Sequence, residues 1–387
     1  MNQIYLDAAS TAKYSNVDDI IVNTITQAMR DSWMNPNSLY APNVRNKINR
    51  CRENIASFIN AKPYEIYYTS GGSESNCMAI QGFVKECRFY NVDPIVITST
   101  IEHKSIKDCV DWLNAEKYLV NVDNQGIINI DKLEQILKLR FGKGKILVSI
   151  QFANNEIGTV QHIKMISDLV HKYGGIFHTD AVQIFGHTTI NVEELGIDMM
   201  SVSGHKISPV LKGVGFLYKK NDIYIKPLIY GSQESGLRGG TENTFGIIGL
   251  NKAIEYCDVS YEKNEEMIDK RNYFISLLES KFGCKLNGHN NYRLPNNINV
   301  TFPQNITGEN LLYMLDISDI KISTGSACNS KSIEPSHVLK AIGLSDKDSM
   351  RSVRFTLSDD ITYKEIDYVI EEIDKVIKIM QGGEINV

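Results

Sequence analysis

Apolar residues recur along parts of this chain with the period of an α-helix. Starting at Val44, they return at Ile48, Cys51, Ile55 and Phe58, which places all of them on one face of a helix. The core of the folded chain is expected on that face. Similar patterns and cap residues predict further helices over residues 16–33, 251–281 and 363–380. Another helix is predicted from the glycine-rich turn at residues 70–75 to about residue 89.

Short runs rich in apolar and β-branched residues separate several of these helical patterns. Such runs are typical of buried strands, and the segments between several of them are long enough for crossover helices. The predicted strands cover residues 65–69, 94–100, 145–150, 175–179, 198–203 and 214–219. The alternation predicts an α/β fold with a largely parallel sheet.

The length of the chain, 387 residues, exceeds what one hydrophobic core usually serves. We therefore expect a large domain over residues 14–257 and a smaller α+β domain over residues 258–387, with residues 1–13 packing on the smaller one. Strands at 298–302 and 353–357 would belong to the small domain.

Polar residues follow four of the predicted strands directly. They are Glu102-His103-Lys104, Asn154-Asn155-Glu156-Ile157-Gly158, Asp180-Ala181-Val182-Gln183 and His205-Lys206. Each group alone has an ordinary explanation as a surface histidine, a turn or a helix cap. Because the carboxyl ends of parallel strands meet at one sheet edge, where ligands collect, the four groups together indicate a site.

Lys206 is the residue of this set with the most specific chemistry. Most lysines are solvated and chemically idle, but a lysine that leaves water in a pocket can act as an amine nucleophile on a carbonyl. The glycine turn at residues 70–75 precedes a helix and could hold a phosphate, although a serine-capped turn explains it equally well. A lysine, Asp180 and a phosphate cradle together fit pyridoxal 5′-phosphate, with Lys206 as the Schiff-base lysine.

Composition limits the partners. Lys+Arg number 41 and Asp+Glu number 46, for a net charge of −5, and no basic block is present, so no direct nucleic-acid contact is expected. No apolar run approaches the length of a membrane span, and the N-terminus lacks a signal-peptide pattern, so we expect a soluble, cytoplasmic protein. The seven cysteines lack metal-ligand spacing, which indicates reduced thiols and no metal site.

Nine motifs carry a resemblance to a known family. The chain resembles the NifS/IscS-type cysteine desulfurases, which are fold-type I pyridoxal-phosphate enzymes of the class V aminotransferase family. The matching segments are YLDAAS (5–10), TSGGSESN (69–76), EHK (102–104), NNEIG (154–158), DAVQ (180–183), SGHK (203–206), RGGTEN (238–243), STGSACNS (323–330) and SVRFTL (352–357).

This resemblance implies the roles of the cofactor residues. Lys206 would bind pyridoxal 5′-phosphate covalently, His103 would stack on its ring and Asp180 would pair with the ring nitrogen. The other expected cofactor-binding residues are Gly72, Ser73, Asn155, Gln183, Ser203 and His205, with Thr241 contributed across the interface of a homodimer.

The resemblance also implies a reaction. L-cysteine would be converted to L-alanine, with Lys206, His103 and Cys328 as catalytic residues and the sulfur taken up as a persulfide on Cys328. The expected contacts of the substrate carboxylate are Asn35, Asn155 and Arg354. The acceptor protein could be an iron–sulfur scaffold, a tRNA thiolation enzyme or a DNA sulfur-modification partner.

Two alternatives stay open from the sequence. The same site could run transamination or selenocysteine lysis, or the chain could be a binding scaffold without turnover, although the intact Lys206, Asp180, His103 and Cys328 argue against a scaffold. Departures from the family pattern fall at 38–41, at 207–213, which is about one residue longer than usual, and at Ser232, Ser235 and Ser358. None of them removes a catalytic group.

Overall fold

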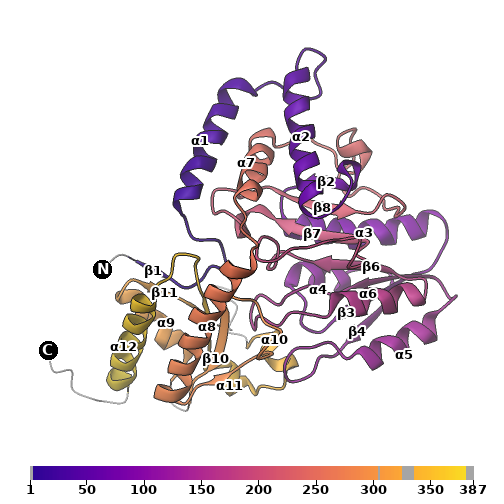
Figure 1. Cartoon of the computed structure of the whole chain (residues 1–387). Coiled ribbons are helices and arrows are strands. Elements are labelled where there is room, and N and C mark those ends of the chain that lie inside the picture. The colour runs from indigo at the N-terminus through magenta and orange to yellow at the C-terminus, as the bar shows by residue number, and fades with distance from the viewer. Residues whose placement is uncertain (1–2, 304–305, 325–334, 381–387) are drawn as a thin grey trace.

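The computed structural model of the chain describes residues 3–303, 306–324 and 335–380. Its centre is a seven-stranded sheet with the strand order β2-β8-β7-β6-β5-β3-β4 (Figure 1). Strand β8 runs antiparallel to both of its neighbours and the other pairs are parallel. The strands are β2 (Ile66–Thr69), β3 (Pro94–Ser99), β4 (Glu116–Val120), β5 (Lys145–Ser149), β6 (Ile176–Asp180), β7 (Met199–Ser203) and β8 (Gly215–Lys219).

Both faces of this sheet are buried. Successive side chains of a strand point to opposite faces, so Ile95 and Ile97 of β3 pack in one hydrophobic cluster while Val96 packs in another. The first cluster also contains apolar residues of α1 (Asn16–Asp31), α2 (Pro42–Phe58), α5 (Ile130–Arg140), α6 (Ile163–Lys172) and α7 (Thr244–Glu255), and the second contains those of α3 (Gly72–Phe89) and α4 (Lys104–Asp111). This double burial explains why the strands read as continuous apolar runs.

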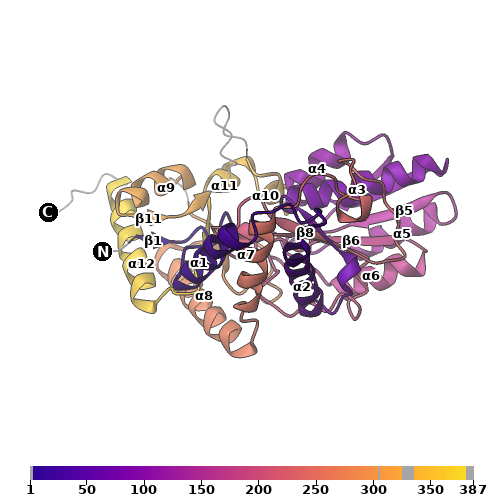
Figure 2. The ribbon, with the colours of Figure 1, turned by 90° about the horizontal axis from the view of Figure 1, so that it is seen from above.

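A second, antiparallel sheet lies beside the first and has the order β12-β13-β10-β9. Its strands are β9 (Lys285–Leu286), β10 (Asn297–Thr301), β12 (Ser323–Thr324) and β13 (Ser352–Thr356). The helices that accompany it are α8 (Tyr261–Phe282), α9 (Gly308–Ile317), α10 (His337–Ala341), α11 (Asp346–Met350) and α12 (Tyr363–Met380), and Figure 2 shows this part at one end of the molecule.

The N-terminus packs on this second part. Strand β1 (Ile4–Tyr5) pairs in parallel with β11 (Ile320–Lys321), and Ile4 and Leu6 lie in the same hydrophobic cluster as apolar residues of α8 and α12. Figure 1 shows β1 beside β11, next to α12. The exact division of the chain at residues 257 and 258 stays a prediction.

The helix predicted over 251–281 is two helices, which corrects the sequence reading. Helix α7 ends at Glu255 and α8 starts at Tyr261. Between them, Asp258 accepts a hydrogen bond from the backbone N–H of Ser260, at 2.9 Å, and Ser260 caps α8 by accepting from the N–H of Lys263. These local side-chain bonds replace helical ones and break the run. None of the described helices is long and apolar enough to cross a membrane.

Candidate active site

A cavity of about 260 Å³ lies where β3, β5, β6 and β7 end. The residues that line it come from the segments after these strands and from the start of α3. They are Gly72, Ser73, Asn76, His103, Ser105, Gln151, Ala153, Asn155, Asp180, Val182, Gln183, Ser203, His205 and Lys206. The structure therefore brings together the four polar groups that the sequence placed after separate strands.

The glycine turn between β2 and α3 forms one wall of the cavity. Gly71 has a φ of +148°, in the region that favours glycine, and a Cβ on Gly72 would lie 2.6 Å from Val182 Cγ2. Only glycine lets the backbone approach this closely. The first N–H groups of α3 lack partners within the helix and carry the positive end of its dipole, so this wall suits a phosphate.

A hydrogen-bonded chain joins the acidic side of the cavity to His103. Asn76 Nδ2 donates to Asp180 Oδ2 at 2.7 Å and to Ser105 Oγ at 3.0 Å. His103 Nδ1 accepts from the backbone N–H of Ser105 at 3.1 Å and lies 2.8 Å from Ser105 Oγ. Since a backbone N–H can only donate, Nδ1 is the unprotonated nitrogen and the neutral ring carries its proton on Nε2.

Charge and burial also act on His103. The residue is exposed where it lines the cavity, and partial loss of water around its ring lowers its pKa, while the charge of Asp180 opposes that shift. Next to it, Glu102 is buried and accepts from Ser99 Oγ at 2.5 Å and from the N–H of Gln151 at 3.0 Å. Burial raises the pKa of Glu102 to about 8. These bonds attach the turn after β3, which carries His103, to the backbone that follows β5.

The position of Asp180 is fixed by the hydrogen bonds of His178, a buried histidine two residues earlier on the same strand, β6. His178 bonds Ser149 Oγ of β5 through Nδ1, at 2.8 Å, and Ser201 Oγ of β7 through Nε2, at 2.9 Å. Burial lowers the pKa of His178 to about 3, so the ring is neutral. These two bonds join β5, β6 and β7 close to the end of β6, where Asp180 lines the cavity. There, Asp180 Oδ1 accepts a hydrogen bond from the N–H of Val182 at 2.9 Å.

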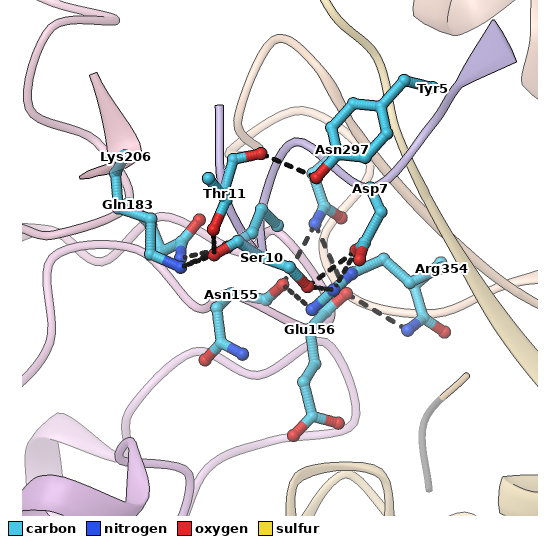
Figure 3. Close-up of polar contacts among 12 residues, drawn as sticks. Tyr5, Asp7, Ser10, Thr11, Asn155, Glu156, Gln183, Lys206, Asn297 and Arg354 are labelled. Atoms are coloured by element: carbon cyan, nitrogen blue, oxygen red, sulfur yellow. Dashed lines mark hydrogen bonds and ion pairs between the residues drawn. The ribbon is translucent and has the colours of Figure 1, made fainter. Parts of the chain in front are cut away.

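Lys206 contacts the N-terminal segment 7–12, here called the strap. Its Nζ donates to the carbonyls of Ala9, at 2.6 Å, and Ser10, at 2.7 Å. Gln183 Nε2 donates to the same Ala9 carbonyl at 3.0 Å, and Figure 3 shows Lys206 and Gln183 together on one side of the strap. Burial, and then the charge of Arg354, lower the pKa of Lys206 to about 8.

Arg354 lies on the other side of the strap (Figure 3). Its Nη2 pairs with Asp7 Oδ1 at 2.5 Å and donates to Ser10 Oγ at 2.9 Å, and its Nη1 donates to the carbonyl of Asn155 at 3.1 Å. Two residues that the resemblance assigns to the substrate carboxylate, Asn155 and Arg354, therefore touch each other.

Two predicted site residues lie elsewhere. Asn35 is exposed, accepts from the N–H of Asn37 at 2.9 Å and does not line this cavity. Thr241 is exposed in a separate cavity beside Arg238, which itself pairs with Glu74 of α3 at 2.7 Å. Cys328 lies outside the described residues.

The sequence reading missed Asn76, Ser105 and the strap. Asn76 stands in the quoted TSGGSESN segment, and its position four residues after Gly72 on the same helix is a signal that could have placed it at the cavity. The carbonyls of Ala9 and Ser10 have no such signal, because any residue supplies a backbone carbonyl.

Some departures from the family pattern now have a structural account. In the longer 207–213 turn, Ser208 is buried and its hydroxyl donates to Asp18 of α1, which holds the turn against that helix. Ser235 adopts a φ of +56°. Ser358 donates to Asp360 at 2.8 Å. Nothing in the structure explains Tyr40 or Ser232.

The comparison with protein families decides the membership of the chain. The family described as "Aminotransferase class-V" matches residues 4–369. The chain belongs to this family. The resemblance inferred from the nine motifs and the expected α/β fold with a mainly parallel sheet are confirmed.

Individual members of the class-V family are similar over almost their whole length. "Cysteine desulfurase IscS" of Dictyoglomus turgidum is 40% identical over 384 residues, which cover 97% of this chain and 95% of that protein. A solved structure titled "NIFS-LIKE PROTEIN" has a TM-score of 0.88 at 30% identity and covers 97% of this chain and 100% of its own. The structure titled "SspA in complex with cysteine" has a TM-score of 0.78 at 33% identity and covers 92% and 99%.

Cysteine desulfurases of the class-V family use pyridoxal phosphate, and the cavity fits that cofactor. A Cβ at Gly72 would collide with Val182, so only glycine brings the N-terminal N–H groups of α3 to this wall of the cavity. Lys206 supplies an amine, and Asp180 supplies a carboxylate acceptor for a ring N–H. Among the described residues, no group of three or more histidine, cysteine or acidic side chains could hold a metal ion.

The environment of Lys206 predicts an amine that is reactive near neutral pH. In cofactor-free protein, acetylation of Lys206 should rise with a midpoint near pH 8, since its pKa is lowered from 10.5 to about 8. The groups that act on it are Arg354, which lowers the pKa, and Asp7 and Asp180, which raise it. Arg354→Gln should therefore move the midpoint upward.

Labelling at several pH values followed by peptide mass spectrometry measures this midpoint, with Lys206→Arg as the control that identifies the labelled peptide. A midpoint near pH 10.5 in the wild type would contradict the described environment of the amine.

Proposed function

We propose that the chain is a pyridoxal-phosphate-dependent cysteine desulfurase that converts L-cysteine to L-alanine and passes the sulfur through a persulfide on Cys328 to an acceptor protein. The observation that carries the proposal is the meeting of Lys206, Asp180 and His103 in one cavity. The 40% identity to a cysteine desulfurase over 97% of the chain supports it.

Each wall of the cavity has a part in holding the cofactor. When bound, pyridoxal phosphate supplies an aldehyde that captures amines and a ring that withdraws electrons from the substrate. Lys206 would hold its aldehyde carbon, Asp180 its ring nitrogen and Gln183 its phenolic oxygen, with His103 against the ring. The phosphate would bind at Gly72, Ser73, Ser203 and His205. Burial lowers the pKa of His205 to about 4, so this imidazole is neutral in the cofactor-free protein.

Lys206 Nζ is suited to move the substrate Cα proton. Because its pKa is lowered to about 8, the free amine would be neutral in a large fraction of molecules near pH 8 and could accept that proton. The carbonyls of Ala9 and Ser10 hold Nζ at the edge of the cavity, so its position is fixed by the chain itself. Loss of this residue removes both cofactor attachment and proton transfer.

The substrate carboxylate would bind at Asn155 and Arg354, and Asn35 stays a predicted third contact. The guanidinium of Arg354 is buried and joined to Asn155 before any substrate arrives, so little side-chain entropy is lost on binding.

Cys328 would complete the reaction. Its thiolate attacks the substrate sulfur: a bond forms between Cys328 Sγ and that sulfur, the substrate Cβ–S bond breaks, and Cβ takes a proton to give alanine. The resemblance assigns the handling of the thiol proton to His103, whose neutral ring would offer the proton on Nε2. The role of Cys328 rests on the STGSACNS resemblance.

The acceptor and the location belong to the same proposal. The acceptor would be an iron–sulfur scaffold, a tRNA thiolation enzyme or a DNA sulfur-modification partner. A cytoplasmic location suits the six described cysteines, which are free thiols and would remain reduced there.

The test of the function is the products from L-cysteine. With a reductant, the cofactor-loaded protein should release alanine and sulfide in equal amounts, whereas transamination would give a keto acid and no sulfide. Parallel assays with L-selenocysteine measure the lyase alternative. Lys206→Ala should lower alanine release by at least about 10³-fold, because it loses a general base as well as the attachment point. A wild type that binds the cofactor but releases no alanine would favour the scaffold reading.

Cys328→Ser separates sulfur transfer from cofactor chemistry in the same assay. It should still bind cofactor and L-cysteine but lose nearly all persulfide and sulfide, since serine is not ionised near neutral pH and forms no persulfide. Cys257→Ser, at a partly exposed cysteine between α7 and α8 that does not line this cavity, is the matched control and should retain activity. A sulfur adduct mapped by mass spectrometry to any other cysteine would show that Cys328 is the wrong residue.

We also propose that the protein works as a two-fold homodimer in which Thr241 reaches the phosphate of the other subunit. An isologous interface builds two such sites at once. The position of Thr241 outside the Lys206 cavity of its own chain and the Arg238–Glu74 ion pair, which ties its loop to the start of α3, support this arrangement.

Thr241→Ala should then release cofactor about tenfold more readily, which is the loss of one hydrogen bond to a charged group, without changing thermal unfolding of the cofactor-free protein. Thr24→Ala, whose hydroxyl bonds only the backbone of its own helix, is the control. Sedimentation that finds an active monomer at assay concentration would contradict the shared site.

A further inference from the structure

Arg354 already holds a carboxylate from its own chain. Asp7 Oδ1 lies 2.5 Å from Arg354 Nη2, and the side chains of Arg354 and Asp7 are 9% and 21% exposed. Ser10 Oγ joins both groups, donating to Asp7 Oδ1 at 2.8 Å and accepting from Arg354 Nη2 at 2.9 Å. Nη1 contacts the carbonyl of Asn155, while Nε is buried and has no partner in the described part of the chain.

We propose that Asp7 is a specificity-determining residue: it shares Arg354 with the α-carboxylate of an amino-acid ligand and thereby sets the affinity of the site for that carboxylate. The inference rests on the proposed function, in which Arg354 binds the substrate carboxylate. It adds that a carboxylate of the chain itself already pairs with the guanidinium to which the substrate carboxylate would bind.

The backbone keeps Asp7 beside Arg354. Thr356, two residues after Arg354 on β13, donates its N–H to the carbonyl of Leu6 at 2.7 Å and accepts from the N–H of Ala8 at 3.3 Å. Asp7 therefore forms a parallel bridge with Thr356. Because its backbone cannot leave without breaking these bonds, an incoming carboxylate meets a guanidinium whose charge is already partly neutralised.

Electrostatics gives the direction of the effect. Two carboxylates close to one guanidinium repel each other, so Asp7 weakens the binding of a second carboxylate. Asp7 also opposes the influence of Arg354 on Lys206, because the two charges shift the pKa of that amine in opposite directions. The strap thus brings one negative charge to the guanidinium of Arg354, and that charge also acts on Lys206.

The substitution Asp7→Asn distinguishes this role from a merely structural one. Asp7→Asn keeps the size of the side chain and an oxygen that can accept from Arg354 Nη2, but removes the charge. The strap keeps its other bonds: Tyr5 OH to the carbonyl of Thr11 at 2.9 Å, and the N–H of Ala12 to the carbonyl of His205 at 3.1 Å. If Asp7 only held the strap in place, its loss of charge would weaken ligand binding. If Asp7 competes for Arg354, the same change should strengthen the binding of a carboxylate.

The experiment compares L-alanine with L-alaninamide, which lacks the carboxylate charge, by calorimetric titration of cofactor-loaded protein. The readout is the ratio of the two dissociation constants within each variant. In Asp7→Asn the preference for L-alanine should rise about tenfold, the scale expected for one partly buried charge contact. Asp360→Asn removes the ion pair that Lys13 makes at 2.7 Å, close to the strap but away from Arg354, and should leave the ratio unchanged.

An unchanged or lower preference for L-alanine in folded Asp7→Asn would overturn the proposal. Should that variant fail to fold, Asp7→Ser removes the same charge and must show the same rise. Product release by the wild type is measured separately. Alanine release from L-cysteine with no change in the ratio would defeat the Asp7 inference alone, and a raised ratio without turnover would defeat the proposed reaction while leaving the role of Asp7 intact.

Discussion

Parallel pairing of β3, β5, β6 and β7 is the constraint on which the site depends. Strands that run the same way must end at the same edge, so residues as far apart in the chain as His103 and Lys206 arrive at one cavity. The buried contacts of His178 with Ser149 and Ser201 join three of these strands just before that edge. The position of each functional group is therefore set by the sheet and not by its own loop.

The strap, which pairs with the second, antiparallel sheet, contacts the site at this edge of the first sheet. Its backbone pairs with β13, its carbonyls bind Lys206 and its Asp7 pairs with Arg354. One short segment thus touches both the amine and the guanidinium of the site. The lowered pKa of Lys206 follows from this enclosure, since burial is its largest cause and the charge of Arg354 its second.

Strand ends were the part of the site that the sequence could predict. Lys206 directly follows an apolar run, and such a run has one stable place in an α/β fold, inside a parallel sheet. The hydrogen bond from Asn76 to Asp180 could not be predicted from the sequence pattern, because it depends on how α3 packs beside β6. The carbonyls of Ala9 and Ser10 carry no residue-specific signal at all. The break between α7 and α8 was missed because local bonds of Asp258 and Ser260 overrode a continuous amphipathic pattern.

The claim at the centre of this account is that Lys206 is the residue that captures pyridoxal phosphate. Borohydride reduction of the cofactor-loaded protein fixes the cofactor to the amine that holds it, and peptide mass spectrometry then locates the added mass. The account predicts one modified peptide, containing Lys206, and no stable adduct in Lys206→Ala. An adduct at any other lysine, or its persistence in the alanine variant, would contradict the account.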